Sequence, residues 1–207
     1  MTLPTQQPRG TLLLFATTVF ISAFLLFQIQ PLISKAILPW FGGTPSVWTT
    51  CMLFFQTLLC GGYTYSHVLT DKLPTRWQAT LHVTLLIVTL AFLNILPSVE
   101  WKPDGNESPT FRITLLLLST VGLPYFILST TGPLLLRWFS LIEPETSPYR
   151  LYALSNAGSL LALLSYPFLF EPLMRLSLQA NSWSVGFCVF AALCIGCVVR
   201  LWKLPPT

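Results

Sequence analysis

Four side-chain amides interrupt otherwise apolar stretches of this 207-residue chain, and they are its main candidates for chemistry. They are Gln28, Gln30, Gln56 and Asn156. An amide buried without a partner costs a few kcal/mol, on the order measured for unpaired polar groups, so each should face other protein groups or a ligand. One interpretation is a polar ligand site between two halves of a helical bundle. The other is hydrogen bonding between helices that fixes their packing. Both interpretations stay open.

Three charged residues lie where apolar runs end: Lys35, Arg137 and Glu171. Gln28 and Lys35 are seven residues apart and would share one helix face if Pro31 leaves the helix continuous. The cations could extend to lipid headgroups and set topology. Alternatively they form a gate, in which Lys35 or Arg137 pairs with Glu171 or Asp71 in one conformation. A Lys35–Glu171 pair fits the predicted geometry, because both residues end their runs on the same side.

Other reactive residue types give no recognisable site. His67 and His82 could reach similar depth on neighbouring helices, but one histidine pair is thin support for haem, and we expect structural roles for both. Cys194 and Cys197 have redox-like spacing but lie inside an apolar run with no βαβ pattern. The sequence has no Ser/His/Asp set, zinc spacing or phosphate loop. We therefore expect no catalytic residues, no metal and no cofactor.

The composition is that of a multi-pass membrane protein. Hydrophobic residues make up 53% of the chain and charged residues 9%, with a mean hydropathy of +0.68. Soluble domains carry about 25% charged residues. The eleven cations are scattered, which argues against nucleic-acid binding. Six apolar runs are each long enough to span a bilayer: 11–38, 46–69, 77–97, 111–139, 149–170 and 182–202.

Two segments about half the chain apart share a pattern. Pro31, Lys35 and Trp40-Phe41 precede Thr44-Pro45, and Pro133, Arg137 and Trp138-Phe139 precede Ser147-Pro148. In each copy a hydroxyl residue before proline is a typical helix start. With three spans per copy, the repeats 11–97 and 111–202 would be inverted. We therefore predict one all-α membrane domain over 1–207 with a 3+3 inverted repeat, similar to half of a major-facilitator transporter.

Cation counts predict the orientation. With six spans, seven cations fall on the side of the termini and four on the other side. The excess predicts that both termini are cytoplasmic. We expect a multi-pass protein of the cell's inner (plasma) membrane. All seven tryptophans fall at run ends or in loops, as expected for an interfacial belt.

Three blocks resemble the membrane module of the fused major-facilitator/spermidine-synthase-like proteins. They are QPLISKAILPWFGGTPSVWTTCMLFFQ (30–56), GLPYFILSTTGPLLLRWF (122–139) and YRLYALSNAGSLLALLSYP (149–167), the last followed by Glu171-Pro172. Members of that family usually continue into an aminopropyltransferase domain, whose glycine-rich motif and acidic pair this sequence lacks. The resemblance therefore implies the membrane module without the enzyme.

Two functions remain open on these grounds. One is a transporter-like half-unit that handles a small, amine-like metabolite as a homodimer or with a partner. The other is a structural subunit that packs in a larger membrane complex or anchors a separate enzyme. Both imply the lipid bilayer and other membrane protein chains as partners.

Overall fold

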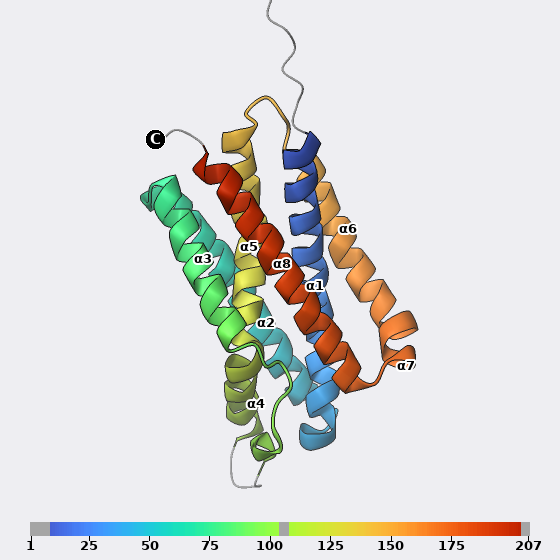
Figure 1. The fold of residues 1–207 in the computed structure, drawn as a ribbon. Helices are drawn as coiled ribbons and strands as arrows, with labels where there is room; N and C mark the ends of the chain where they lie inside the picture. Colours follow the sequence, from blue (N-terminus) through green and yellow to red (C-terminus); the bar gives the residue numbers. More distant parts are fainter. Residues whose placement is uncertain (1–8, 104–107, 204–207) are drawn as a thin grey trace, which may run out of the picture.

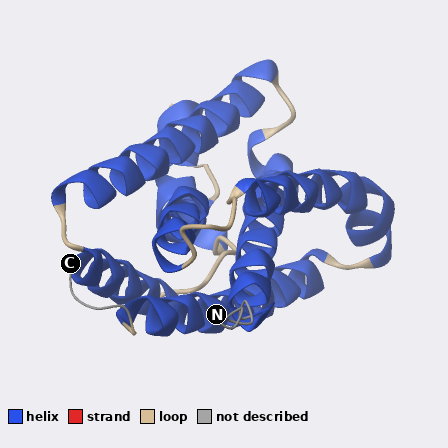
Figure 2. Ribbon diagram, turned by 90° about the horizontal axis from the view of Figure 1, so that it is seen from above, coloured by secondary structure: helices blue, strands red, loops and turns tan. Residues whose placement is uncertain are grey.

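The chain is a bundle of long helices. The computed structural model describes residues 9–103 and 108–203. The structure is 87% helix, and the described residues contain no strand, as Figure 2 shows from above. The predicted all-α class is therefore confirmed.

The helices follow the predicted apolar runs closely. They are α1 (Arg9–Phe41), α2 (Pro45–Lys72), α3 (Thr75–Ala91), the short η1 (Val99–Trp101), α4 (Pro109–Leu117), η2 (Leu118–Gly122), α5 (Leu123–Ile142), α6 (Tyr149–Ser165), η3 (Tyr166–Phe170), α7 (Glu171–Leu173) and α8 (Leu176–Trp202). Both η2 and η3 are single π-helical turns. Pro167 lies inside η3, and Pro124 lies two residues after η2; proline lacks the N–H that a regular α-turn uses.

Four helical segments in the described chain are long and apolar enough to cross a membrane: Gly10–Phe41, Pro109–Ile142, Tyr149–Leu173 and Leu176–Trp202. These segments indicate a membrane protein. The helices α2 and α3 also form where spans were predicted, but they do not meet that standard. The first has 28 residues and carries polar side chains such as Gln56 and His67, and the second has 17 residues. The six-span arrangement therefore stays a prediction.

Two predicted boundaries are wrong. The third run was expected to reach residue 97, but α3 ends at Ala91. Asn94 and Pro97 follow, and both residue types favour turns over helix interiors. The last run was expected to begin at residue 182, but α8 begins at Leu176. The Gln179 side chain donates hydrogen bonds to the carbonyl oxygens of Phe170 (3.2 Å) and Met174 (2.8 Å), which ties the new helix to the preceding turn.

Successive long helices alternate in direction, so α1, α3 and α6 run one way and α2, α5 and α8 the other (Figure 1). The helices α1 and α5 are central. The most extensive packing is between α1 and α6, with α2 against α5 and α1 against α8 next. The first described residues of α1 and the last of α8 lie at the same end of the bundle.

Small residues bring two helix pairs close together. A Cβ atom at Gly62 of α2 would overlap the Ser129 side chain of α5. A Cβ at Gly158 of α6 would lie 2.7 Å from the backbone oxygen of Phe20 in α1. Beside the first contact, the Ser66 hydroxyl donates to the carbonyl oxygen of Thr130 at 2.9 Å. Both crossings depend on glycine, as is common where membrane helices meet.

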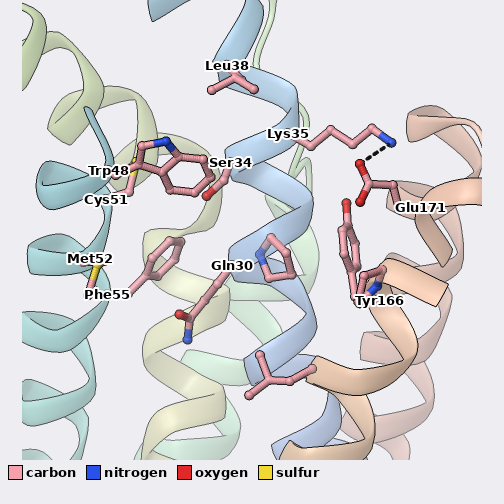
Figure 3. Close-up of a pocket in the computed structure, with 13 residues that line it drawn as sticks. Gln30, Ser34, Lys35, Leu38, Trp48, Cys51, Met52, Phe55, Tyr166 and Glu171 are labelled. Atoms are coloured by element: carbon pink, nitrogen blue, oxygen red, sulfur yellow. Dashed lines mark ion pairs between the residues drawn. The ribbon is translucent and has the colours of Figure 1, made fainter. Parts of the chain in front are cut away.

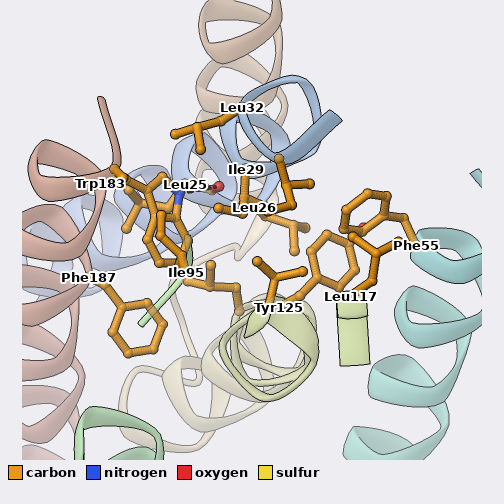
Figure 4. Close-up of a cluster of buried hydrophobic side chains, with 14 of the residues drawn as sticks. Leu25, Leu26, Ile29, Leu32, Phe55, Ile95, Leu117, Tyr125, Trp183 and Phe187 are labelled. Atoms are coloured by element: carbon orange, nitrogen blue, oxygen red, sulfur yellow. Dashed lines mark hydrogen bonds between the residues drawn. The ribbon is translucent and has the colours of Figure 1, made fainter. Parts of the chain in front are cut away.

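The core holds two tryptophans that the sequence analysis assigned to an interfacial belt. Trp138 and Trp183 are 0% and 2% exposed, so that assignment is wrong for both. The Trp183 indole donates to the backbone oxygen of Leu25 at 3.0 Å, and Figure 4 shows it among the buried apolar side chains. The Trp138 indole donates to Gln78 Oε1 at 3.0 Å. A buried indole needs such a partner, because its N–H would otherwise remain unpaired.

Candidate functional site

The candidate site is a cavity of about 570 Å³ between the two sequence halves, at the end of the bundle where α1 ends. The first half contributes α1 and α2, and the second contributes α6, η3 and α7 (Figure 3). Its lining is Gln30, Pro31, Ser34, Lys35, Leu38, Trp48, Cys51, Met52, Phe55, Leu163, Tyr166, Pro167 and Glu171. The cavity thus combines aromatic surface with one cation and one anion.

The two charged groups form an ion pair across the cavity rim. Lys35 Nζ lies 3.3 Å from Glu171 Oε1 (Figure 3). The side chains are 36% and 48% exposed, and pairs this exposed contribute about 0–1 kcal/mol. The pair proposed from sequence is therefore present, and separating its charges costs little. A gating role for it stays a prediction.

Three polar groups line the cavity below the ion pair. Gln30 Nε2 donates to the Tyr125 hydroxyl at 3.2 Å, which fixes the amide against α5. The Tyr166 residue is buried, and its hydroxyl has no hydrogen-bond partner within residues 9–103 and 108–203. Figure 3 shows its ring extending toward Glu171. Ser34 is also buried, one helical turn from Gln30. The Gln30 amide and the Ser34 hydroxyl can therefore orient a polar ligand between the charges and the aromatic surface, whereas the Tyr166 hydroxyl is buried inside the protein.

The other predicted site residues lie elsewhere. Gln28 lines a second cavity against α8, so it does not share a site with Lys35 as the seven-residue spacing suggested. The η3–α7 segment divides the two: Tyr166 and Glu171 line one cavity and Phe170 lines the other.

The remaining predicted residues do not join the ion pair either. Gln56 is exposed on α2. Asn156, also exposed, lines a third cavity of about 210 Å³ whose polar lining includes Ser129, Ser155 and Ser159. Arg137 is exposed near the end of α5, a helix that ends at the opposite end of the bundle (Figure 1), and the described residues offer it no ion pair. Of the cations proposed for the gate, only Lys35 is paired with Glu171 in the described residues.

The histidines differ in their surroundings. His82 is 1% exposed and lies edge-on to Trp138, with 5.9 Å between ring centroids. His67 is exposed on α2. Within the described ranges no three His, Cys, Asp or Glu side chains are grouped as a metal site would require. The expectation that the protein holds no cofactor stays a prediction.

Sequence reasoning did not single out Tyr166, Trp48 or Ser34. Ser34 had a usable signal, because it follows Gln30 by four residues and so shares its helix face. Tyr166 had none, because the π-turn that positions it cannot be read from hydropathy. A family-model scan and searches of curated proteins and of solved structures found no match to this chain.

Proposed function

We propose that this chain is a non-enzymatic membrane module that forms one half of a carrier for a small, amine-like metabolite. The observation that supports the proposal is the Lys35–Glu171 ion pair, which joins the two halves at the rim of a cavity. A carrier needs a binding site between units that move against each other, and a contact between them that opens at low cost. The half-exposed ion pair has that character.

The direction of the helices is consistent with this proposal. Helices α1 to α3 run opposite to α5, α6 and α8 in order (Figure 1). The pattern of contacts is also reciprocal: α1 packs on α6, and α2 packs on α5, so the first helix of each half meets the second helix of the other. An inverted 3+3 repeat of the predicted kind would produce this reciprocity. The resemblance to the major-facilitator/spermidine-synthase-like membrane module also implies such a repeat.

The chemistry of the cavity favours a cationic ligand. Glu171 supplies a carboxylate, and the rings of Trp48, Phe55 and Tyr166 supply faces on which an ammonium group can rest. In the structure, the Glu171 carboxylate already forms an ion pair with the ammonium group of Lys35. An incoming amine would therefore displace Lys35, bind Glu171 and break the contact between the halves in one step.

This competition gives a direct test with 1,4-diaminobutane as the probe. Binding is measured by isothermal titration with the protein in nanodiscs. Glu171→Gln should abolish binding, whereas Lys35→Met should strengthen it, because the internal competitor is gone. Glu145→Gln, an exposed carboxylate in the 143–148 loop, is the matched control and should bind as the wild type does. Weaker binding by Lys35→Met would refute the competition mechanism. If the wild type does not bind the probe at all, the proposal that the ligand is an amine is refuted.

The alternative is a structural subunit of a larger membrane complex, or an anchor for a separate enzyme. It is favoured by Gln56, a polar residue exposed on α2, which flanks the α1–α5 centre. Polar side chains facing lipid are costly, so that face requires cover by protein. A second copy would complete a carrier, and a different chain would make this one a subunit.

Disulfide trapping distinguishes a second copy of this chain from a different membrane protein at that face. A Gln56→Cys variant is oxidised in native membranes with the exposed Cys60 and Cys188 replaced by serine. A covalent homodimer supports the carrier half-unit. A heavier adduct with a different membrane protein supports the subunit role. Leu178→Cys, exposed on α8 away from that face, is the control for random collision.

A further inference from the structure

The ion-pair cavity is electrically balanced before any ligand enters. Among the described residues that line it, Lys35 and Glu171 carry the charges, and they neutralise each other across 3.3 Å. Much of the remaining lining is apolar and includes Trp48, Met52 and Phe55. Apolar walls screen charge less well than water, so a surplus charge inside the cavity is costly. Binding is therefore favoured for a ligand that leaves the cavity neutral.

A simple amine satisfies only one member of the pair. When its ammonium group displaces Lys35 from Glu171, the lysine loses the one carboxylate that the described lining contains. A monoamine then leaves one unbalanced positive charge at the cavity, and a diamine leaves two. Positive charges held close together repel each other, which weakens the binding of either amine. A cation alone is thus an incomplete match for a site that contains Lys35.

A ligand with both charges satisfies both residues. Its ammonium group would bind Glu171, and a carboxylate would bind Lys35. The two side chains are half-exposed and come from different helices, α1 and α7, so a ligand can reach both and lie between them (Figure 3). The flexible stem of lysine lets its head follow the carboxylate. This exchange replaces one ion pair with two and leaves the net charge unchanged.

We propose that the cavity selects a zwitterion, in which a short apolar spacer joins an ammonium group to a carboxylate, over an amine that lacks the carboxylate. The inference rests on the proposed carrier site and names its substrate class. Lys35 then determines specificity, because it binds the carboxylate of the ligand in addition to competing for Glu171. The spacer would lie against the apolar surface of the cavity.

The test compares 4-aminobutanoate with 1,4-diaminobutane, two probes with the same four-carbon chain that differ at one end. Binding is measured by isothermal titration with the protein in dodecyl maltoside micelles, which contain no zwitterionic lipid. We expect 4-aminobutanoate to bind about two- to fivefold more tightly, which corresponds to one additional half-exposed ion pair. Equal or tighter binding of the diamine would overturn the zwitterion and leave the amine carrier standing. Binding of 4-aminobutanoate alone would support the zwitterion and refute a purely cationic substrate, and binding of neither probe would refute both proposals.

Variants of Lys35 test its assigned role. Lys35→Met should bind the diamine more tightly without a matching gain for 4-aminobutanoate, so the preference for the zwitterion should disappear. Tight binding of the diamine also shows that this variant is folded. Lys35→Arg retains a cation and should keep the preference. Lys102→Met is the matched control, because Lys102 lies 5.9 Å from the Trp40 ring centroid and is not part of the cavity lining. A preference that survives Lys35→Met would overturn the assignment of the carboxylate to Lys35.

A lipid head group could present similar charges from the bilayer. Phosphatidylethanolamine joins an ammonium group to a phosphate, so dioleoyl phosphatidylethanolamine is titrated into the same micelles with 4-aminobutanoate present. We expect the lipid to leave the binding of 4-aminobutanoate unchanged. Displacement of 4-aminobutanoate by the lipid would assign the site to a head group and overturn the soluble zwitterion.

Discussion

Replacement of Gly62 by alanine should push α2 away from α5, and the size of the effect follows from the structure. The new Cβ would overlap the Ser129 hydroxyl and would lie 2.9 Å from Ser129 Cβ and 3.2 Å from its backbone carbonyl carbon. Rotation of the serine side chain relieves the overlap with its hydroxyl alone. The contacts with Cβ and the backbone remain, so the helices themselves must separate.

The expected cost is that of overpacking a close contact, about 1–3 kcal/mol. Alanine also favours a helix interior over glycine by up to about 1 kcal/mol, which offsets part of the cost. The adjacent Gly61 isolates the two terms, because a Cβ there meets only a Phe126 ring carbon, at 4.0 Å. Gly61→Ala should therefore be stabilised only by the higher helix propensity of alanine. The difference in unfolding free energy between the two alanine variants should therefore equal the steric cost.

The assay is unfolding by sodium dodecyl sulfate in mixed dodecyl maltoside micelles, followed by circular dichroism. Gly61→Ala should unfold at an equal or higher detergent fraction than the wild type. Gly62→Ala should unfold earlier, by a difference from Gly61→Ala that corresponds to about 1–3 kcal/mol. If the two variants have the same midpoint, α2 and α5 do not approach as closely at Ser129 as the structure has them, and the reasoning fails.

Three further substitutions test the packing in the same assay. Ser66→Ala should cost about 0.5–1.5 kcal/mol, because it removes the hydrogen bond to the Thr130 carbonyl, and an unchanged unfolding midpoint would mean that this bond does not stabilise the α2–α5 contact. Trp138→Phe should cost at least about 1–3 kcal/mol, because Gln78 Oε1 is left buried and unpaired, and adding Gln78→Leu should recover part of the loss. Lys35→Met should change stability by less than about 1 kcal/mol, since its ion pair is half-exposed, and a larger loss would mean that the pair holds the halves together.

Much of the fold could be predicted because hydropathy and helix-start chemistry are local properties. The apolar runs gave the long helices to within a few residues in most cases, and Thr44-Pro45 gave the start of α2, with Thr44 as its N-cap. The start of α6 at Tyr149 lies one residue after the Ser147-Pro148 signal. The end of α3 was missed, because residues 92–97 continue the apolar run of the sequence although the helix stops at Ala91.

The candidate site was predicted in part. Gln30, Lys35 and Glu171 line one cavity, and the two charges pair across it. Gln28, by contrast, faces a different cavity from Lys35 although the two share a heptad spacing, because the η3–α7 segment lies between those cavities. Periodicity assigns a helix face, but it does not say which neighbour covers that face.

The sequence by itself determined that this chain is helical, apolar and suited to a membrane, because composition and periodicity act residue by residue along the chain. It also determined which polar groups would need partners. Only the tertiary structure determined the partners, which are Glu171 for Lys35 and Tyr125 for Gln30. The Gln28 nitrogen has no hydrogen-bond partner among the described residues. Such pairings join residues up to about two-thirds of the chain apart, and they depend on how helices cross at glycines such as Gly62 and Gly158. No local pattern encodes those crossings, since they result from the fit of whole helix surfaces.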